Sequence, residues 1–430
     1  MTNLTPTELS SEFSYALDRM EEGANLFITG RAGTGKSTLL RIFRKTTSKN
    51  CVVLAPTGVA ALNVQGQTIH SFFGFPPRLL QRKDIKPNRR YKRIFERLET
   101  LIIDEISMVR ADVLDAIHYG LQINRRSTGP FGGVQVIFIG DLYQLPPVVS
   151  TPMERQYFSE IYASPYFFSA DALDFIDLEM VELSRVYRQD SKHFLRLLEG
   201  IRNATIDRDD LEDLNQRYQP SFDNFGQNYL TLAARNAKVN TINRRELDDL
   251  VNPTHTYLAE IKGDFPERLY PTDPALQVKE GAQVMTLRND TEKRYVNGTI
   301  GTIIECTPDA IKIRTDEGGK RREFEVGYEE WEIIRYSMDK DDPSKIGTET
   351  VGTFKQLPIR LAWAVTIHKA QGKTFDKVII DLGSGAFESG QTYVALSRCR
   401  TLDGIVLNNP IQLRDIMVDP AIVEYYRSMR

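Results

Sequence analysis

The stretch GRAGTGKS at residues 30–37 is the strongest indication of the fold. It matches the pattern GxxxxGK[ST], in which glycines let backbone N–H groups curl around phosphate oxygens. The apolar run NLFITG at residues 25–30 predicts a short buried strand, and the amphipathic run STLLRIFRK at residues 37–45 predicts a helix. Because this strand–loop–helix order is the context that the pattern requires, we predict a phosphate-binding loop rather than a chance glycine-rich turn.

Two side chains of this loop have specific expected roles. Lys36 should reach the β- and γ-phosphates of a bound nucleoside triphosphate, and Ser37 should ligate Mg²⁺. The helix that begins here adds the partial positive charge of its N-terminal N–H groups. The residues that we expect to bind the nucleotide in this loop are Gly33, Thr34, Gly35, Lys36, Ser37 and Thr38.

An acidic pair follows a second apolar run. Asp104 and Glu105 come directly after LII at residues 101–103. Asp104 is placed to hold the Mg²⁺ shell, and Glu105 to orient or deprotonate the attacking water. A lone acidic pair is usually a solvated surface feature. Here it leaves a buried strand in a chain that already has a phosphate loop, so we predict that both carboxylates belong to the nucleotide site.

Further apolar runs alternate with helical stretches along the chain. This alternation predicts doubly wound parallel sheets whose ligands bind at the carboxyl ends of the strands. The runs of parallel-sheet character lie at residues 51–58, 98–109, 133–141, 228–236, 376–383 and 404–409.

The stretch between the later runs has a different texture. Apolar and polar residues alternate there between glycine-rich turns, which is typical of antiparallel strands and predicts a small inserted barrel. The expected fold class is therefore α/β, with two P-loop parallel-sheet domains, a small basic insert and an inserted antiparallel β-barrel. The predicted boundaries are 1–180 for the first domain with its insert at 74–97, 181–253 with 358–430 for the second, and 254–357 for the barrel.

Two further motifs carry candidate side chains for phosphoryl transfer. Gln144 follows the strand VQVIFIG at residues 134–140, where a polar side chain can touch the γ-phosphate. A planar guanidinium stabilises the charge that develops on the γ-oxygens. Spacing alone does not choose among the candidate arginines, which are Arg185, Arg188, Arg398 and Arg400.

Composition excludes several classes of protein. The 430 residues are 41% hydrophobic and 26% charged, as in ordinary globular proteins, and no apolar run approaches the ~18 residues needed to span a bilayer. The three cysteines lack CxxC spacing, which argues against a disulfide framework or a zinc site and favours a reducing compartment. The N-terminus shows no secretory signal pattern. We expect a cytoplasmic protein.

The net charge of −3 speaks against a uniformly basic nucleic-acid binder, so any polyanion site must be local. Residues 78–97 hold nine Lys or Arg against two acids, with Tyr91 and Phe95 spaced four apart. A run of charge is usually a solvated helical face. This one is interleaved with aromatic residues, which favours contact with nucleic acid through its phosphates, and the expected contacts are Arg89, Arg90, Lys92 and Arg93. Residues 320–322 form a second, more ambiguous basic tip.

The aromatic run that precedes this segment has two interpretations. Phe72, Phe73 and Phe75 fit an ordinary core, and they also fit a surface that stacks on bases. We include Phe72 among the expected DNA contacts. His70 and His368, taken on spacing alone, are more typical of satisfied structural histidines.

The order of the motifs resembles superfamily 1 helicases of the RecD-related branch 1B, specifically the petite-integration-frequency (Pif) DNA helicase family with its compact bacterial-type core. The resemblance runs from about residue 20 to 408. The motifs that carry it are GRAGTGKS, APTGVAALNVQGQTIHSFF, LIIDEISMV, GDLYQLPPV, LSRVYRQ, AWAVTIHKAQGKTFDKVIIDLG and YVALSRCRTLDGI.

The resemblance implies roles for individual residues. The positions that match the family's nucleotide site are Lys36, Asp104, Glu105, Gln144, Arg188 and Arg398, with Gln371 and Gly372 beside the nucleotide. The positions that match its DNA-contact motifs are Thr57, His70, Thr366 and His368. The chain departs from the family at Phe13, where a glutamine usually reads adenine, so we expect other nucleoside triphosphates to be accepted as well.

The resemblance implies an ATP- and Mg²⁺-dependent 5′-to-3′ DNA helicase that moves on single-stranded DNA, acts at single-strand/duplex junctions and on G-quadruplexes, and serves repair and telomere maintenance. We expect a bacterial, nucleoid-associated protein that is monomeric when free and has no membrane partner. The residues by themselves leave two alternatives open. One is a nucleic-acid translocase or remodeller that does not unwind, and the other is a nucleotide-dependent clamp with little turnover.

Overall fold

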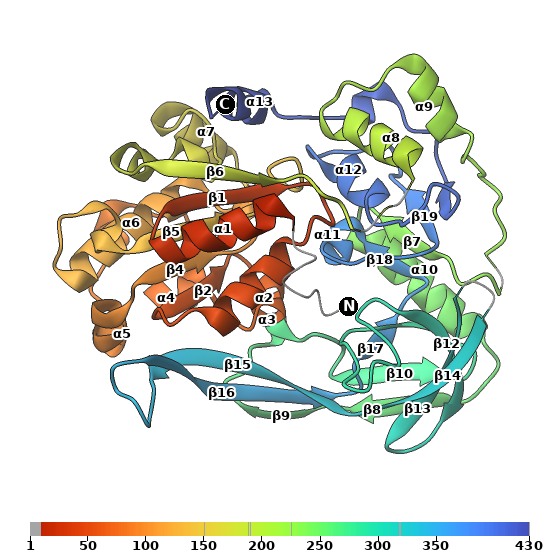
Figure 1. Ribbon diagram of the computed structural model, residues 1–430. Coiled ribbons are helices and arrows are strands. Elements are labelled where there is room, and N and C mark those ends of the chain that lie inside the picture. Colours follow the sequence, from red (N-terminus) through yellow and green to blue (C-terminus); the bar gives the residue numbers. More distant parts are fainter. Residues whose placement is uncertain are drawn as a thin grey trace. The chain divides into compact units, whose positions relative to one another are not determined.

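The computed structural model describes residues 10–149, 151–187, 189, 191–224, 226–317 and 320–429. The chain forms two compact units (Figure 1). Unit 1 comprises Met1–Tyr187, Ile333–Val351 and Asp419–Arg430, and unit 2 comprises Arg188–Glu332 and Gly352–Val418. Residues 333–351, which we assigned to the barrel, and residues 419–429, which we assigned to the second α/β domain, thus pack within unit 1. The three-part division of the chain stays a prediction.

Unit 1 is built on a six-stranded sheet in which neighbouring strands run parallel. Its central strands are buried along their whole length, as expected for a parallel sheet covered on both faces. Across the sheet the strands are β3 (Gln67–Thr68), β2 (Cys51–Ala55), β4 (Thr100–Ile103), β5 (Gln135–Ile139), β1 (Asn25–Gly30) and β6 (Leu178–Leu183).

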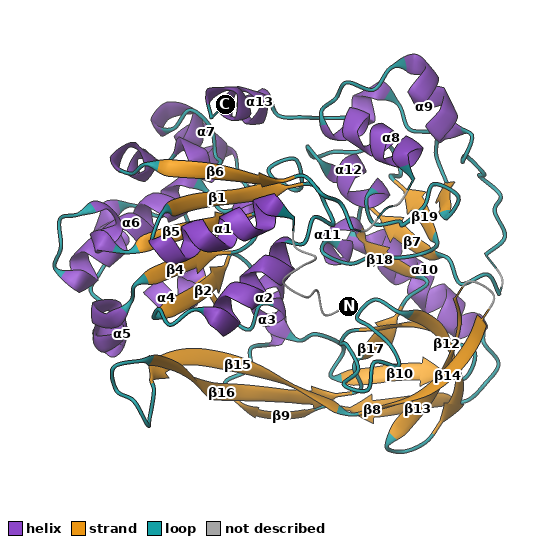
Figure 2. Ribbon diagram, in the orientation of Figure 1, coloured by secondary structure: helices purple, strands orange, loops and turns teal. Residues whose placement is uncertain are grey.

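Helices cover both faces of this sheet (Figure 2). Side chains alternate along each strand, so Ile28 packs with α1 and α2 residues such as Phe13, whereas Phe27 packs with the core that holds α6 residues such as Leu114. The predicted fold class is confirmed in this unit. Its helices are α1 (Ser11–Glu22), α2 (Lys36–Thr46), α3 (Gly58–Asn63), α4 (Ile69–Phe73), α5 (Lys92–Arg97), α6 (Ala111–Arg125), α7 (Pro152–Ile161) and α13 (Pro420–Ser428).

Unit 2 contains a second parallel sheet, of four strands, as predicted. Across this sheet the strands are β18 (Ala364–Thr366), β7 (Leu230–Ala233), β19 (Val378–Asp381) and β20 (Ile405–Leu407). The helices of the unit are α8 (Lys192–Arg202), α9 (Arg208–Asn215), α10 (Asn236–Asp249), α11 (Ile367–Ala370) and α12 (Gln391–Leu396).

The predicted antiparallel region lies between β7 and β18 in the sequence. Its largest sheet has the strand order β14-β13-β12-β11-β17, and β15 and β16 form a long hairpin whose far end packs in unit 1. The strands are β8 (Thr254–Leu258), β9 (Glu260–Gly263), β10 (Ala275–Lys279), β11 (Gln283–Thr286), β12 (Ile300–Cys306), β13 (Ala310–Glu317), β14 (Lys320–Gly327), β15 (Glu329–Met338), β16 (Ile346–Gln356) and β17 (Ile359–Leu361). No helix in the described ranges is long and apolar enough to cross a membrane.

Candidate nucleotide and nucleic-acid sites

The phosphate loop joins β1 to α2 at the carboxyl edge of the unit 1 sheet. Gly35 has a φ of 92° and Gly30 a φ of 142°, and residues with a side chain rarely adopt such backbone angles. A Cβ at Gly30 would also lie 2.4 Å from the carbonyl oxygen of Leu183. The Nζ of Lys36, the first residue of α2, donates hydrogen bonds to the carbonyl oxygens of Gly30 (2.6 Å) and Arg31 (3.0 Å). The loop is therefore curled around the lysine ammonium at a helix N-terminus, which fits a phosphate group.

The acidic pair lies at the end of β4, two strands from β1 in the sheet order. Asp104 is buried, and its backbone N–H donates to the carbonyl of Leu54 at 2.9 Å. Burial and the charge of Glu105 raise the pKa of Asp104, while the charge of Lys36 opposes the shift. A carboxylate in such a place gains from a nearby cation, so Asp104 fits the expected Mg²⁺ site, and Ser37 lies in the first turn of α2 beside Lys36.

Glu105 has a left-handed backbone, with φ 52° and ψ 44°. This conformation is uncommon for a non-glycine residue and costs backbone energy, and such residues cluster at active sites. The chain leaves β4 at Ile103 and takes this conformation directly after Asp104. Sequence pattern had assigned both carboxylates to the site, but it gave no sign of this backbone geometry.

The predicted γ-phosphate sensor Gln144 is buried after β5 and is held by Asp141. The Gln144 Nε2 donates to the Asp141 Oδ2 at 3.2 Å, and the Gln144 N–H donates to the Asp141 carbonyl at 3.0 Å. The Tyr143 N–H also donates to Asp141, at 3.3 Å. We had not singled out Asp141, although its place immediately after a buried strand was a usable signal.

Phe13 lies under the phosphate loop. Its side chain is buried in the core between α1 and α2, and a Cβ at Gly35 would lie 3.6 Å from its ring. Tyr187, which we did not predict as a site residue, lies on the same side of Gly35 and donates its N–H to the Gly33 carbonyl at 2.9 Å. The guanidinium of Arg185 lies 5.0 Å from the Tyr187 ring centroid.

The candidate arginines have different surroundings. Arg188 lies outside the described residues. Arg398 is buried, and its guanidinium donates to Ser397 Oγ (2.8 Å) and to the Val394 carbonyl (2.9 Å). Arg400 is paired with Asp376 at 3.1 Å.

The two residues expected beside the nucleotide follow α11 in unit 2. Gln371 ends that helix and donates its N–H to the His368 carbonyl at 3.2 Å. Gly372 has a φ of 77°, and nothing lies within 4 Å of the position that a Cβ would take.

Each of the two predicted DNA-contact threonines caps a helix that follows a parallel strand. Thr57 follows β2 and accepts from the Ala60 N–H at 3.2 Å, so it caps α3. Thr366 ends β18 and accepts from the Lys369 N–H at 3.3 Å, so it caps α11. Each hydroxyl stabilises the first turn of a helix at the carboxyl edge of a sheet.

The two histidines have different surroundings. His70 is half-buried on α4 and lies edge-on to Phe75, with ring centroids 6.4 Å apart. His368 is exposed on α11, and its Nε2 lies 3.1 Å from Oε2 of Glu388. Sequence spacing had not indicated this acidic partner.

The burial of Phe72 corrects our expectation that its ring contacts bases. Phe72 is 0% exposed and stacks on Tyr91 with ring centroids 5.3 Å apart. Phe73 and Phe75 are buried as well, so the core interpretation of this aromatic run holds. The run had looked ambiguous because the residues that cover it, such as Tyr336, come from distant parts of the sequence.

The basic segment, residues 78–97, has a buried and an exposed side. Tyr91 and Phe95 point into the core, whereas the cationic side chains face solvent. The exposed side chains include all four predicted contacts, which are Arg89, Arg90, Lys92 and Arg93. Lys92 lies 3.9 Å from Glu96, a pair too exposed to hold the lysine firmly.

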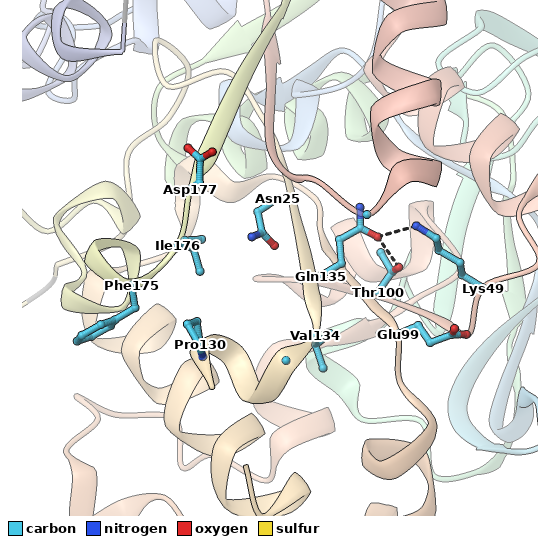
Figure 3. Close-up of a pocket in the computed structure, with 12 residues that line it drawn as sticks. Asn25, Lys49, Glu99, Thr100, Pro130, Val134, Gln135, Phe175, Ile176 and Asp177 are labelled. Atoms are coloured by element: carbon cyan, nitrogen blue, oxygen red, sulfur yellow. Dashed lines mark hydrogen bonds between the residues drawn. The ribbon is translucent and has the colours of Figure 1, made fainter. Parts of the chain in front are cut away.

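A cavity of about 450 Å³ lies at the other edge of the unit 1 sheet, where the strands begin (Figure 3). The Gln135 side chain accepts from Thr100 Oγ1 (2.8 Å) and from Lys49 Nζ (3.1 Å), and it donates to the Met20 carbonyl (2.9 Å). These polar groups satisfy one another. The residues that line the cavity include neither the phosphate loop nor any other predicted site residue.

The chain is similar to known proteins over nearly its whole length. The family model described as PIF1-like helicase matches residues 9–212. The ATP-dependent DNA helicase Pif1 of Bdellovibrio bacteriovorus is 34% identical, over 98% of this chain and 92% of that protein. The ATP-dependent DNA helicase PIF1 of Xenopus laevis is longer: it is 32% identical, and the match spans 98% of this chain and 64% of that protein.

Solved structures of Pif1 from Bacteroides sp cover nearly the whole chain. The complex with ADP-AlF4 has a TM-score of 0.90 at 37% identity and covers 98% of this chain and 96% of that one. The complex with single-stranded DNA has a TM-score of 0.69 at 38% identity, with the same coverage. Since its sequence is more than 30% identical to a curated Pif1 helicase over nearly the full length of both proteins, this chain belongs to the Pif1 family of ATP-dependent DNA helicases.

Proposed function

We propose that the protein is an ATP-dependent helicase that moves 5′-to-3′ on single-stranded DNA and unwinds duplexes at a junction. The observation that carries the proposal is the carboxyl edge of the unit 1 sheet. There the phosphate loop with Lys36, the Asp104–Glu105 pair and Gln144 follow β1, β4 and β5 of one parallel sheet. Family membership supports ATP as the nucleotide, and the ADP-AlF4 complex of the Bacteroides protein supports binding at such a site.

Each side chain of this edge has a role that its surroundings favour. Lys36 and the backbone N–H groups of the loop bind and orient the phosphates. Ser37 and Asp104 would hold Mg²⁺, which neutralises charge that develops on the phosphate oxygens. Glu105 positions the attacking water and accepts its proton, and Gln144 contacts the γ-phosphate from its anchor on Asp141.

Arginine side chains complete the proposed nucleotide site. We assign the stabilisation of γ-phosphate charge to Arg188 and Arg398, with Gln371 and Gly372 beside the nucleotide. An arginine suits this role because its guanidinium is planar and always charged. Withdrawal of Arg398 from its present carbonyl and hydroxyl partners would be part of that function.

The DNA contacts follow from the edges of both sheets. Thr57 and His70 in unit 1, and Thr366 and His368 in unit 2, are proposed to contact one strand. The basic segment is proposed to contact phosphates of the junction through its exposed side chains. The structure of Bacteroides Pif1 bound to single-stranded DNA supports single-strand binding as such. We extend the proposal to G-quadruplexes, genome maintenance in a bacterial nucleoid, a monomeric free state, and the three-part domain division with a barrel at 254–357.

Strand displacement with matched 5′-tailed and 3′-tailed duplexes tests the proposal. We expect ATP-dependent release from the 5′-tailed duplex and little from the 3′-tailed one. ATP hydrolysis stimulated by single strands without release from either duplex would identify a translocase that does not unwind. The absence of any stimulation of hydrolysis would overturn both assignments.

A further inference from the structure

The carboxyl edge of the unit 2 sheet carries an aromatic residue that the proposed DNA contacts do not include. Three neighbouring strands, β18, β7 and β19, run parallel and end at this edge. The chain that leaves β18 carries Thr366 and His368, the chain that leaves β7 carries Arg235, and the chain that leaves β19 carries Phe387. Topology therefore brings all four residues to one surface.

Contacts confirm that these segments meet. The Oε2 of Glu388 lies 3.1 Å from Nε2 of His368, which joins the segment after β19 to α11. The guanidinium carbon of Arg235 lies 5.9 Å from the ring centroid of Phe387, which joins the same segment to the start of α10. The Phe387 N–H donates to the side chain of Gln391 at 3.1 Å, and Gln391 is 0% exposed. The backbone beneath the ring is thus fixed by a buried group.

Phe387 is 53% exposed although its backbone is anchored. A single exposed apolar side chain is ordinary, but this one lies beside a guanidinium. Arg235 faces its ring, and His368 and Lys369 lie on α11, which the Glu388 contact brings alongside. Phe175, in unit 1, is 60% exposed and offers a comparison, because its ring is stacked on His118 with centroids 5.6 Å apart.

We propose that Phe387 is a base-stacking residue of the DNA track, with Arg235 binding a phosphate or packing on the stacked base. The inference rests on the proposed function, since it assumes that a single strand crosses this edge. Every base has a π-face, so a fixed aromatic ring binds a strand without reading its sequence. Binding without sequence preference suits a protein that must move along DNA.

Fluorescence anisotropy with labelled oligo-dT and an abasic strand of equal length tests the assignment. Phe387→Leu keeps an apolar side chain but removes the ring, and we expect it to weaken oligo-dT binding about tenfold. The dependence of affinity on salt should stay unchanged, because stacking releases no counterions. Phe387→Trp should restore the affinity. The wild-type protein should lose more affinity for the abasic strand than Phe387→Leu does, since only the wild type has a stacked base to lose.

Phe175→Leu is the matched control, and it should bind both strands as the wild type does. Equal losses on the abasic strand in wild type and Phe387→Leu would overturn the stacking role, even if Phe387→Leu binds more weakly through altered folding. Failure of the wild-type protein to bind oligo-dT would instead overturn the proposed function itself. Arg235→Gln should make the salt dependence shallower by about one phosphate contact, which separates its role from that of the ring.

Discussion

The hydroxyl oxygen of Tyr426 lies 2.7 Å from Oγ1 of Thr29, and both residues are buried. Thr29 immediately precedes Gly30 of the phosphate loop. The Tyr426 ring also stacks on Tyr143, with centroids 5.3 Å apart and an interplanar angle of 14°. Tyr143 is the neighbour of Gln144 in the proposed γ-phosphate sensor. The last described helix of the chain, α13, is therefore anchored at two points beside the proposed nucleotide site of unit 1.

Tyr426→Phe removes the hydroxyl but keeps the ring on Tyr143. We expect the free energy of unfolding of unit 1 to fall by about 1–3 kcal/mol, because Thr29 Oγ1 is left without its buried partner. Urea denaturation followed by far-ultraviolet circular dichroism measures this change. Tyr15→Phe is the control: its hydroxyl donates to Glu179 at 2.7 Å, but the side chain is 50% exposed and the decrease should be smaller. Equal decreases in both variants would contradict the importance of the buried anchor.

Glu105→Gln tests the proposed water-positioning role. The amide keeps the size of the side chain and the left-handed backbone, but it cannot accept the proton of the attacking water. We expect nucleotide binding close to wild type and hydrolysis slower by roughly two to four orders of magnitude. Nucleotide binding is measured by equilibrium titration with a labelled analogue, and hydrolysis by single-turnover kinetics. Ordinary single-turnover hydrolysis in this variant would exclude Glu105 as the base.

Neutralising the basic segment tests its role at the junction. The combined change of Arg89, Arg90, Lys92 and Arg93 to glutamine should weaken binding to a forked duplex. The salt dependence of binding should also become shallower, by roughly 0.9 in log–log slope for each phosphate that the segment no longer binds. The control neutralises four exposed cations elsewhere, which are Arg155, Lys192, Arg208 and Arg414. A similar change of slope in both variants would mean that net charge, rather than this segment, sets the affinity.

Much of the fold was predictable because local pattern and global architecture agree. The phosphate loop needs glycine at Gly30, where any Cβ would meet the Leu183 carbonyl, so the motif and its backbone are tied together. The apolar runs became the parallel strands of two sheets, since a strand buried on both faces must be apolar throughout. The acidic pair could be placed for the same reason, because it leaves such a strand.

The residues that were misplaced or missed have a different physical cause in common. Phe72 looked available for bases because the side chains that cover it come from distant segments, Tyr91 in the basic insert and Tyr336 in the long hairpin. Tyr426 lies almost at the end of the sequence, and no local pattern connects it with Thr29. Such contacts depend on tertiary packing, which periodicity does not encode.

Phe13 gives a prediction about nucleotide selectivity. Phe13 occupies the position at which the Pif1 family usually has a glutamine that reads adenine. Its ring is buried and is part of the core beneath Gly35. Without that amide, we expect kcat/KM for GTP to lie within about tenfold of that for ATP, since strong discrimination needs hydrogen bonds to the base. Steady-state hydrolysis with both nucleotides measures the ratio. A preference for ATP of more than about a hundredfold would show that another group reads adenine.

The hairpin contact with β2 gives the last prediction. The Tyr336 hydroxyl accepts from the Val53 N–H at 2.8 Å and donates to the Val53 carbonyl at 3.2 Å. It therefore satisfies both backbone groups of a residue in β2, and Gln67 supports it by accepting from the Tyr336 N–H at 3.5 Å. Tyr336→Phe leaves a buried donor and acceptor without this partner, which should cost about 1–3 kcal/mol.

The destabilisation should be local before it is global. We expect amide hydrogen exchange at Val53 to accelerate in Tyr336→Phe more than exchange at the central strand β5, because the hydroxyl protects one strand and not the whole sheet. Limited proteolysis of residues 339–345, at the end of the hairpin, should accelerate in parallel. Tyr328→Phe is the control, since Tyr328 belongs to unit 2 and does not contact Val53 in the described structure. Unchanged exchange at Val53 would mean that water replaces the hydroxyl, and that other contacts, such as the aromatic contact with Phe72, hold the hairpin in unit 1.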